Sequence, residues 1–256
     1  MSKVVDFSFA RPNPKDIKAK GYVGVMRYLS SNASKRISAS EVKDLQANGL
    51  AIGLVWEDTA KAPLKGFNQG VFDANNAKKQ AGDIGFPETL PIYFAVDFDT
   101  TPQDQVKIND YLLGCMSVLG TGRIGVYGSY YVIERCYAGN SASWFWQTKA
   151  WSGGQKSSHN HIYQNGETPN ISGTDVNEVL MDNWGQWNLA QNTGATAPVS
   201  SQTHPSTPDT VSSLPEANNT LESPSTPPVS NEPVVIQAEN KKISIIQIII
   251  NWLKNL

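Results

Sequence analysis

The sequence predicts an α/β protein, an eight-stranded (β/α)8 barrel in which some helices are reduced to loops. Two observations lead to this prediction. Eight short and mostly apolar runs recur in the first 190 residues, and segments with helical patterning separate several of them. Continuous apolar strands that alternate with helices are typical of a parallel sheet covered on both faces. Eight such units are enough to close a barrel.

Each predicted strand is short and rich in β-branched and aromatic residues. The predicted strands cover residues 4–8, 22–29, 50–57, 91–99, 123–129, 143–151, 160–165 and 173–179. An open doubly wound sheet is the alternative fold. No glycine-rich phosphate loop supports it, because "GSYYVIE" after the fifth strand is not a dinucleotide fingerprint.

Three segments between these strands have helical patterning. Residues 38–49 form the first, with Ser38 or Ser40 as the expected N-cap, and residues 70–85 and 101–120 form the other two. Some of the other helices are expected to be reduced to loops.

Composition divides the chain into three parts. Residues 1–189 carry the predicted barrel. Residues 190–240 hold eight of the 15 prolines and no Lys or Arg, and are rich in Ser, Thr, Asn and Gln. Such a segment cannot bury enough apolar surface to offset its ordering entropy, so a disordered linker is expected.

The third part, residues 241–256, reads "KKISIIQIIINWLKNL". Polar residues recur there at helical spacing among Ile, Leu and Trp, which predicts an amphipathic Ile-rich helix. The apolar run is shorter than the ~20 residues that span a bilayer. Residues 243–256 could instead contact a membrane surface or form an oligomer, because their Ile residues follow a heptad.

Charge and the N-terminal segment narrow the function classes. The net charge is −2, with no basic excess that would point to a nucleic-acid partner. The N-terminal "MSKVVDFSFA" has no apolar segment of signal-peptide length. We therefore expect synthesis in the cytoplasm and no Sec-type export.

Five carboxylates fall at predicted strand ends, where a (β/α)8 barrel carries its chemistry. Strands one, three, four and eight supply them: Asp6, Glu57, Asp97 with Asp99, and Asp175. Residues i and i+2 of a strand point to the same side, so Asp97 and Asp99 could reach one cleft. Facing carboxylates push their pKa values apart, which gives the acid and the base that glycosidic cleavage needs.

Aromatic, amide and basic side chains stand at matching places. The predicted substrate-binding residues are Arg27, Tyr28, Trp56, Tyr127, Trp146, Gln147 and Gln164. Aromatic faces stack on sugar rings, and amides hydrogen-bond to hydroxyl groups, so a cleft lined this way suits a saccharide. The competing interpretation is core packing for the aromatic residues and helix capping for the acids.

These motifs resemble a known family. The order "VVDFS", "GLAIGLVWE", "PIYFAVDFD", "IGVYGS", "WFWQTKAW" and "HIYQN…GTDVNEV" is similar to the glycoside-hydrolase-like domain of unknown function 1906, found in actinobacterial secreted proteins and phage lysins. That family is similar to the family 25 lysozymes. The resemblance covers about residues 3–187 and implies a barrel that hydrolyses peptidoglycan.

The resemblance also implies roles for the carboxylates. Asp6 corresponds to the first-strand Asp of the lysozymes, and Asp175 to the last-strand Asp. The fourth strand of the lysozymes carries Asp-x-Glu with Glu as the general acid, but this chain has "DFD", which gives Asp99 the acid position and Asp97 the stabilising one. Glu57 matches the glycoside-hydrolase-like domain instead.

Asp is one methylene shorter than Glu, and a proton donor misplaced by about 1 Å can cost on the order of 100-fold in rate. Either Glu57 has taken over the acid role, or the substrate sits closer, or turnover is slow or absent.

The sequence leaves three competing hypotheses for the function. The first is a cell-wall hydrolase that cuts β-1,4 bonds of peptidoglycan, released as a phage lysin or exported by a non-classical route. The second is a barrel that binds cell-wall glycan without cutting it. The third is a metal-dependent enzyme, because Asp-x-Asp can hold a divalent cation. No sugar-nucleotide motif accompanies that pair, so neither a metal nor a cofactor is expected.

Overall fold

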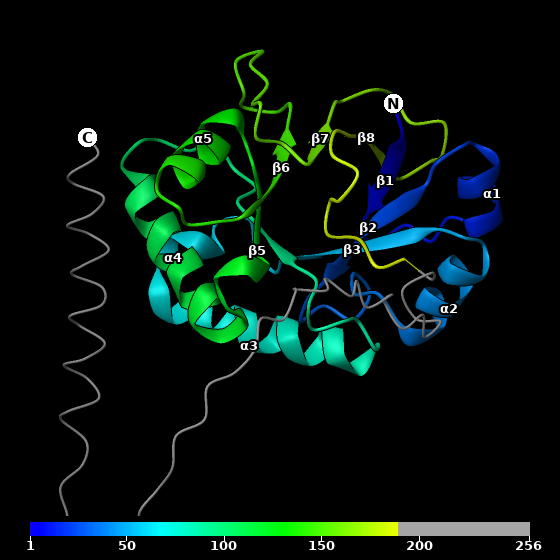
Figure 1. Cartoon of the computed structure of the whole chain (residues 1–256), viewed down its shortest axis with the longest axis horizontal. Helices are drawn as coiled ribbons and strands as arrows, with labels where there is room; N and C mark the ends of the chain where they lie inside the picture. The colour runs from blue at the N-terminus through cyan, green and yellow to red at the C-terminus, as the bar shows by residue number, and fades with distance from the viewer. Residues whose placement is uncertain (189–256) are drawn as a thin grey trace, which may run out of the picture. The chain divides into compact units, whose positions relative to one another are not determined.

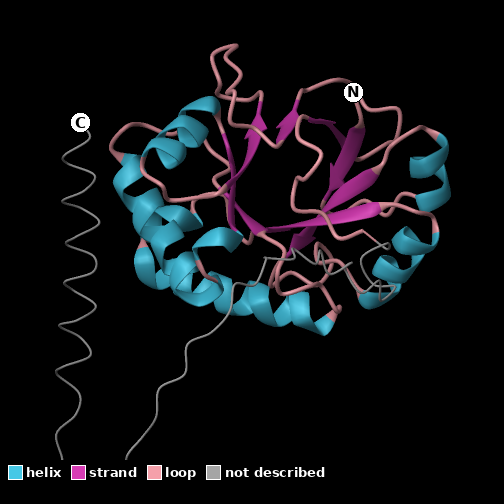
Figure 2. Ribbon diagram, in the orientation of Figure 1, coloured by secondary structure: helices cyan, strands magenta, loops and turns pink. Residues whose placement is uncertain are grey.

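A computed structural model describes residues 1–188 and shows a closed eight-stranded barrel with helices against part of its outside and loops beside β6, β7 and β8 (Figures 1 and 2). The elements in chain order are β1 (Lys3–Phe7), α1 (Pro14–Ala19), β2 (Gly24–Leu29), α2 (Ala39–Ala47), β3 (Ala51–Trp56), a 3-10 turn (Ala62–Lys65), α3 (Phe67–Asp83), β4 (Ile92–Ala95), α4 (Asp104–Leu119), a 3-10 turn (Thr121–Arg123), β5 (Ile124–Gly128), α5 (Tyr130–Ala138), β6 (Trp144–Thr148), β7 (Ile162–Gln164) and β8 (Asp175–Val179). All eight predicted strands are present, which confirms the predicted fold class.

One strand departs from the expected parallel arrangement. Strands β1 to β7 pair in parallel, whereas β8 is antiparallel to both β7 and β1. Residues 165–174 join β7 to β8 without a helix, and a parallel crossover needs a dozen or more residues. The reversal places Asp175, the first residue of β8, opposite Asp6 of β1.

The helices fit the prediction in part. Helix α2 begins after Ser38, whose side chain accepts a hydrogen bond from the backbone of Glu41 as an N-cap. Helices α3 and α4 lie within or close to the predicted ranges, and α1 and α5 are helices that the prediction did not name. No helix follows β6 or β7, as the prediction of reduced helices requires.

Side chains alternate between the two faces of the barrel wall, as the period of two requires. Val5, Val25 and Leu54 belong to a large apolar cluster that also contains residues of every helix. Val4, Met26 and Val55, each next to one of them in the chain, belong to a second cluster that fills the interior. We call these the outer face and the inner face.

The segment after β8 packs against the inner face. The Tyr93 hydroxyl donates a hydrogen bond to the backbone oxygen of Trp184 at 3.0 Å. Trp184 is buried in the inner cluster, and a Cβ on Gly53 would lie 2.7 Å from its ring. Trp187 pairs with Ile52 of β3. This segment therefore belongs to the barrel core.

The predicted linker, residues 190–240, and the predicted helix, residues 241–256, lie outside the described residues. Within residues 1–188, no helix has both the length and the apolar character needed to cross a membrane.

Candidate active site

Three carboxylates from three strands converge at the carboxyl end of the barrel. Asp6 lies in β1, Glu57 directly follows β3, and Asp97 follows β4. The charges of all three raise the pKa of the Tyr28 hydroxyl on β2, although burial is the larger cause. The same three charges act on Tyr127 of β5. Contacts agree with this arrangement, because Lys35 touches both Tyr28 and Glu57 and Gln164 bonds to both Tyr127 and Asp6.

Asp6 is the most deeply buried of these acids, with 2% of its surface exposed. Its Oδ2 accepts hydrogen bonds from the amides of Gln164 at 2.9 Å and Asn177 at 2.8 Å. Burial raises the pKa of Asp6 to about 7, and the nearby charge of Asp175 adds to the rise, whereas the two amides oppose it. A carboxyl group that titrates near neutral pH is typical of an active site.

Asp97 and Glu57 form an unequal pair. Lys35 Nζ lies 3.0 Å from Glu57 Oε2, and the Glu57 side chain is 15% exposed. Burial raises the pKa of Asp97, the charge of Glu57 raises it further, and Lys35 opposes the rise. The ammonium group of Lys35 also lies 4.6 Å from the centre of the Tyr28 ring. Glu57 is therefore ion-paired with Lys35 and stands beside an Asp97 whose pKa is raised.

The floor of the site is a hydrogen-bonded layer. Gln164 Oε1 accepts from the hydroxyls of Tyr127 and Thr148, each at 2.9 Å. Below it, the Trp146 indole donates to Asn177 Oδ1 at 2.7 Å. Trp146 is fully buried, so it orients Asn177 and presents no ring to a ligand.

Two of the five predicted acids, Asp99 and Asp175, are exposed. The prediction placed Asp97 and Asp99 at the end of a strand. Strand β4 ends at Ala95 instead, so both residues belong to the loop that follows it. Asp97 is half-buried and Asp99 is exposed, so strand alternation does not bring both to one face. Asp175 is exposed as well, but its charge reaches Asp6 across the β1–β8 pair.

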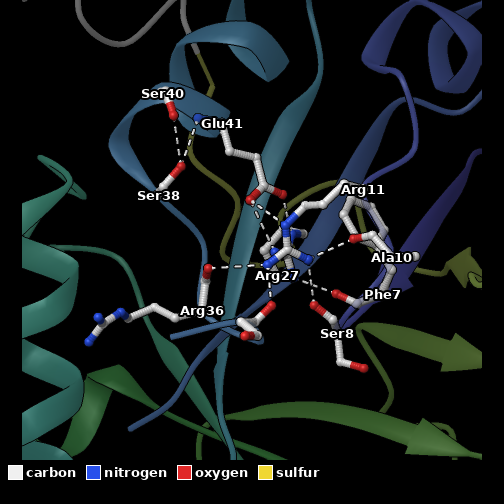
Figure 3. Close-up of polar contacts among 10 residues, drawn as sticks. Phe7, Ser8, Ala10, Arg11, Arg27, Arg36, Ser38, Ser40 and Glu41 are labelled. Carbon is white, nitrogen blue, oxygen red and sulfur yellow. Dashed lines mark hydrogen bonds and ion pairs between the residues drawn. The ribbon is translucent and has the colours of Figure 1, made fainter. Parts of the chain in front are cut away.

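The prediction that Arg27 binds substrate is wrong, because its side chain is 0% exposed on the outer face. Its guanidinium pairs with Glu41 of α2, with Nε 2.5 Å from Oε1, and donates to the backbone oxygen of Phe7 (Figure 3). Arg11 lies 3.6 Å from the same carboxylate. Arg27 therefore joins the wall to α2.

Trp56 and Gln147 also face outward, contrary to the prediction. Trp56 is buried in the outer apolar cluster that contains residues of α3. Gln147 is fully buried, and both ends of its amide are satisfied by residues of the loop that follows β6. Since strand residues alternate, an outward neighbour accompanies each inward residue.

Sequence reasoning missed three residues of the site. Thr148 and Asn177 lie on predicted strands, and their inward phase could have been derived from Trp146 and Asp175 by alternation. Lys35 lies in the loop between β2 and α2, and the loop sequence "SSNASKRIS" contains no motif that would identify it as a site residue. Among residues 1–188, no group of three or more His, Cys, Asp or Glu has a geometry that could hold a metal ion.

Comparison with known proteins shows which family and which solved structures this chain is similar to. Residues 15–184 match the model of the Rv2525c-like, glycoside hydrolase-like domain. Rv2525c of Mycobacterium tuberculosis, named as a candidate peptidoglycan hydrolase, is 29% identical over 204 residues, or 73% of this chain and 84% of its own length. The crystal structure of that Tat-secreted protein with L-tartrate matches with a TM-score of 0.69 at 28% identity, over 73% of this chain and 98% of that one.

Two enzymes share the fold at lower identity. The modular autolysin LytC of Streptococcus pneumoniae has a TM-score of 0.53 at 17% identity, over 69% of this chain and 46% of that one. The muramidase of Trichobolus zukalii has a TM-score of 0.52 at 14% identity, over 70% and 93%. At these identities the likeness concerns the barrel alone.

Proposed function

Because the chain belongs to the Rv2525c-like, glycoside hydrolase-like domain family, we propose that it is a muramidase-type hydrolase that cleaves β-1,4 glycosidic bonds of peptidoglycan. The observation that carries the proposal is the cluster in which Lys35 joins Glu57 to Tyr28 and Gln164 joins Asp6 to Tyr127. LytC, which shares the barrel, has been crystallised with a synthetic peptidoglycan ligand. This substrate would place the action of the protein at the cell wall.

Asp97 is our choice for the general acid. Protonation of the glycosidic oxygen requires a carboxyl group that still holds its proton near neutral pH and can reach the substrate. Asp97 is our candidate, since burial and the Glu57 charge raise its pKa, which favours the protonated form, and its side chain is only half-buried. Its proton would pass to the leaving oxygen as the bond between that oxygen and the sugar carbon breaks.

Glu57 is our choice for the ionised partner. Bond cleavage leaves positive charge on the sugar ring carbon and ring oxygen, and a nearby carboxylate stabilises that charge. The Lys35 ammonium group lies 3.0 Å from Glu57 Oε2 and holds this side chain in place. The nucleophile that completes the reaction would be a water molecule or the N-acetyl group of the substrate.

Asp6 would form the charged floor beneath these two groups. It is nearly inaccessible, and the amides of Gln164 and Asn177 hold its carboxylate. Its partial ionisation near neutral pH adds negative charge below the reacting sugar, and we assign it to electrostatic stabilisation.

The test is the release of reducing ends from purified peptidoglycan. The full chain should release them, and Asp97→Asn and Glu57→Gln should each lower the rate by about 100-fold or more. Asp44→Asn is the matched control, because Asp44 is exposed on α2, and it should leave the rate unchanged.

Two outcomes would reject the proposed reaction. Release that survives both substitutions would place the chemistry elsewhere. Absence of release together with sedimentation of the protein on the same walls would assign the barrel to glycan binding without cleavage.

A further inference from the structure

The loop between β6 and β7 carries an exposed tryptophan in an unusual backbone conformation. Trp151 is 39% exposed and has φ +56°, and its loop extends beyond the two strands (Figure 1). Only Asn140 shares a positive φ among the non-glycine residues of the described chain. Asn tolerates the left-handed region, whereas a bulky residue there is strained.

Buried polar groups fix this loop from within. The Gln147 amide donates to the backbone oxygen of Gln155 at 2.8 Å, and its oxygen accepts from the Ser157 backbone and the Asn160 side chain, each at 2.8 Å. The Ser152 hydroxyl, next to Trp151 in the chain, donates to the Thr148 backbone oxygen at 2.6 Å. Backbone strain persists only where the surroundings over-determine it, as they do here.

The loop begins inside the candidate active site. The Thr148 hydroxyl donates to Gln164 Oε1, and Gln164 in turn donates to Asp6. Trp151 is three positions after Thr148 in the chain, so their Cα atoms lie within about 11 Å of each other. The loop that carries the exposed tryptophan therefore starts at the hydrogen-bonded layer that holds Asp6.

A second aromatic residue lies beside this loop. Tyr131, in the first turn of α5, is 37% exposed, and its hydroxyl accepts a hydrogen bond from the Gln155 side chain at 3.2 Å. A Cβ on Gly153 would lie 3.2 Å from the same hydroxyl. The connections after β5 and β6 thus present aromatic surface at the carboxyl end of the barrel.

We propose that Trp151 is a stacking platform that holds a hexosamine ring of the glycan strand next to the site of cleavage. The platform rests on the proposed function and adds a binding subsite to it. A large apolar side chain that is strained and exposed contributes little to stability, and strain of this kind concentrates at ligand-binding positions. Aromatic rings supply large contact area at low cost in side-chain entropy.

The experiment measures the affinity of the full chain for purified peptidoglycan by co-sedimentation, together with the melting temperature. Trp151→Asn removes the ring but tolerates the left-handed backbone. We expect about a tenfold or greater loss of affinity at an unchanged or higher melting temperature. Trp151→Phe should keep part of the affinity.

Phe72→Ala is the matched control, because Phe72 is 60% exposed on α3 and its helix covers the outer face. It should bind as the unchanged protein does. Wild-type affinity in Trp151→Asn, or equal losses in Trp151→Asn and Trp151→Phe, would overturn the platform. If the unchanged chain neither sediments with peptidoglycan nor cleaves it, the proposed function fails and the platform fails with it.

Discussion

The two faces of the barrel wall use the same residue types for different purposes. Arg27 and Tyr28 are neighbours on β2, and Trp146 and Gln147 are neighbours on β6. Tyr28 faces the carboxylates inside the barrel, whereas Arg27 pairs with Glu41 of α2 outside it. On β6 the order is reversed, since Trp146 is internal and Gln147 external. Phase along the strand, and not residue chemistry, decides which side chain belongs to the site.

This difference has energetic consequences. The outer-face groups of Arg27 and Gln147 are paired within the protein, so their removal should cost stability and leave the chemistry of the site intact. Polar groups of the inner face surround carboxylates whose pKa values burial raises. Their removal should change titration and activity more than it changes folding.

The largest effect is expected at Arg27. Arg27→Met leaves the Glu41 carboxylate without its closest partner and the Phe7 backbone oxygen without a donor. We expect the free energy of unfolding to fall by about 3–5 kcal/mol, measured by urea denaturation. The adjacent inner-face variant Tyr28→Phe should cost about 1 kcal/mol or less, and equal losses would refute the distinction between the faces.

The next effect is a pH dependence that belongs to the inner face. The pKa of Asp6 is about 7 in the folded protein and 3.8 in the reference state. Between these values the folded protein holds a proton that the unfolded chain has released, so the contribution of Asp6 to stability is greatest below pH ~4. It decreases by about 3 kcal/mol as the pH rises towards 7.

Urea denaturation across this pH range measures the dependence. Asp6→Asn should flatten it and should make the protein more stable than the wild type at pH 8. An unchanged slope in the variant would show that Asp6 titrates normally.

A smaller effect separates two buried amides. Gln147→Met leaves the backbone N–H of Ser157 and the amide of Asn160 without acceptors, so we expect a loss of about 2 kcal/mol and faster proteolysis of the loop after β6. Gln164→Met, on the inner face, should instead raise the pKa of Asp6, because one amide donor is lost. Limited proteolysis and a carboxyl titration distinguish the two results.

Much of the architecture could be predicted, because strand alternation and apolar runs are local signals. The eight strands and the cap at Ser38 belong to this class. The reversal of β8 could not be predicted, since it depends on the length of a connection without a helix. The outward phase of Arg27 and Trp56 was missed because a strand-end position was treated as an inward one.

The carboxylates were recognised by position, but their relations depend on tertiary structure. Lys35 reaches Glu57 from a loop that carries no motif, and the amides that hold Asp6 come from β7 and β8, far along the chain. The early end of β4 at Ala95 separates Asp97 from Asp99 in exposure. No local pattern reports these contacts.

The central claim is that carboxylates from separate strands form one coupled site on the inner face. The most direct measurement is a carbon-13 NMR titration of the Asp97 carboxyl group in the wild type and in Glu57→Gln. The account predicts a pKa for Asp97 above its ordinary value in the wild type, and a lower pKa once the Glu57 charge is removed. An ordinary pKa that does not respond to Glu57→Gln would contradict it.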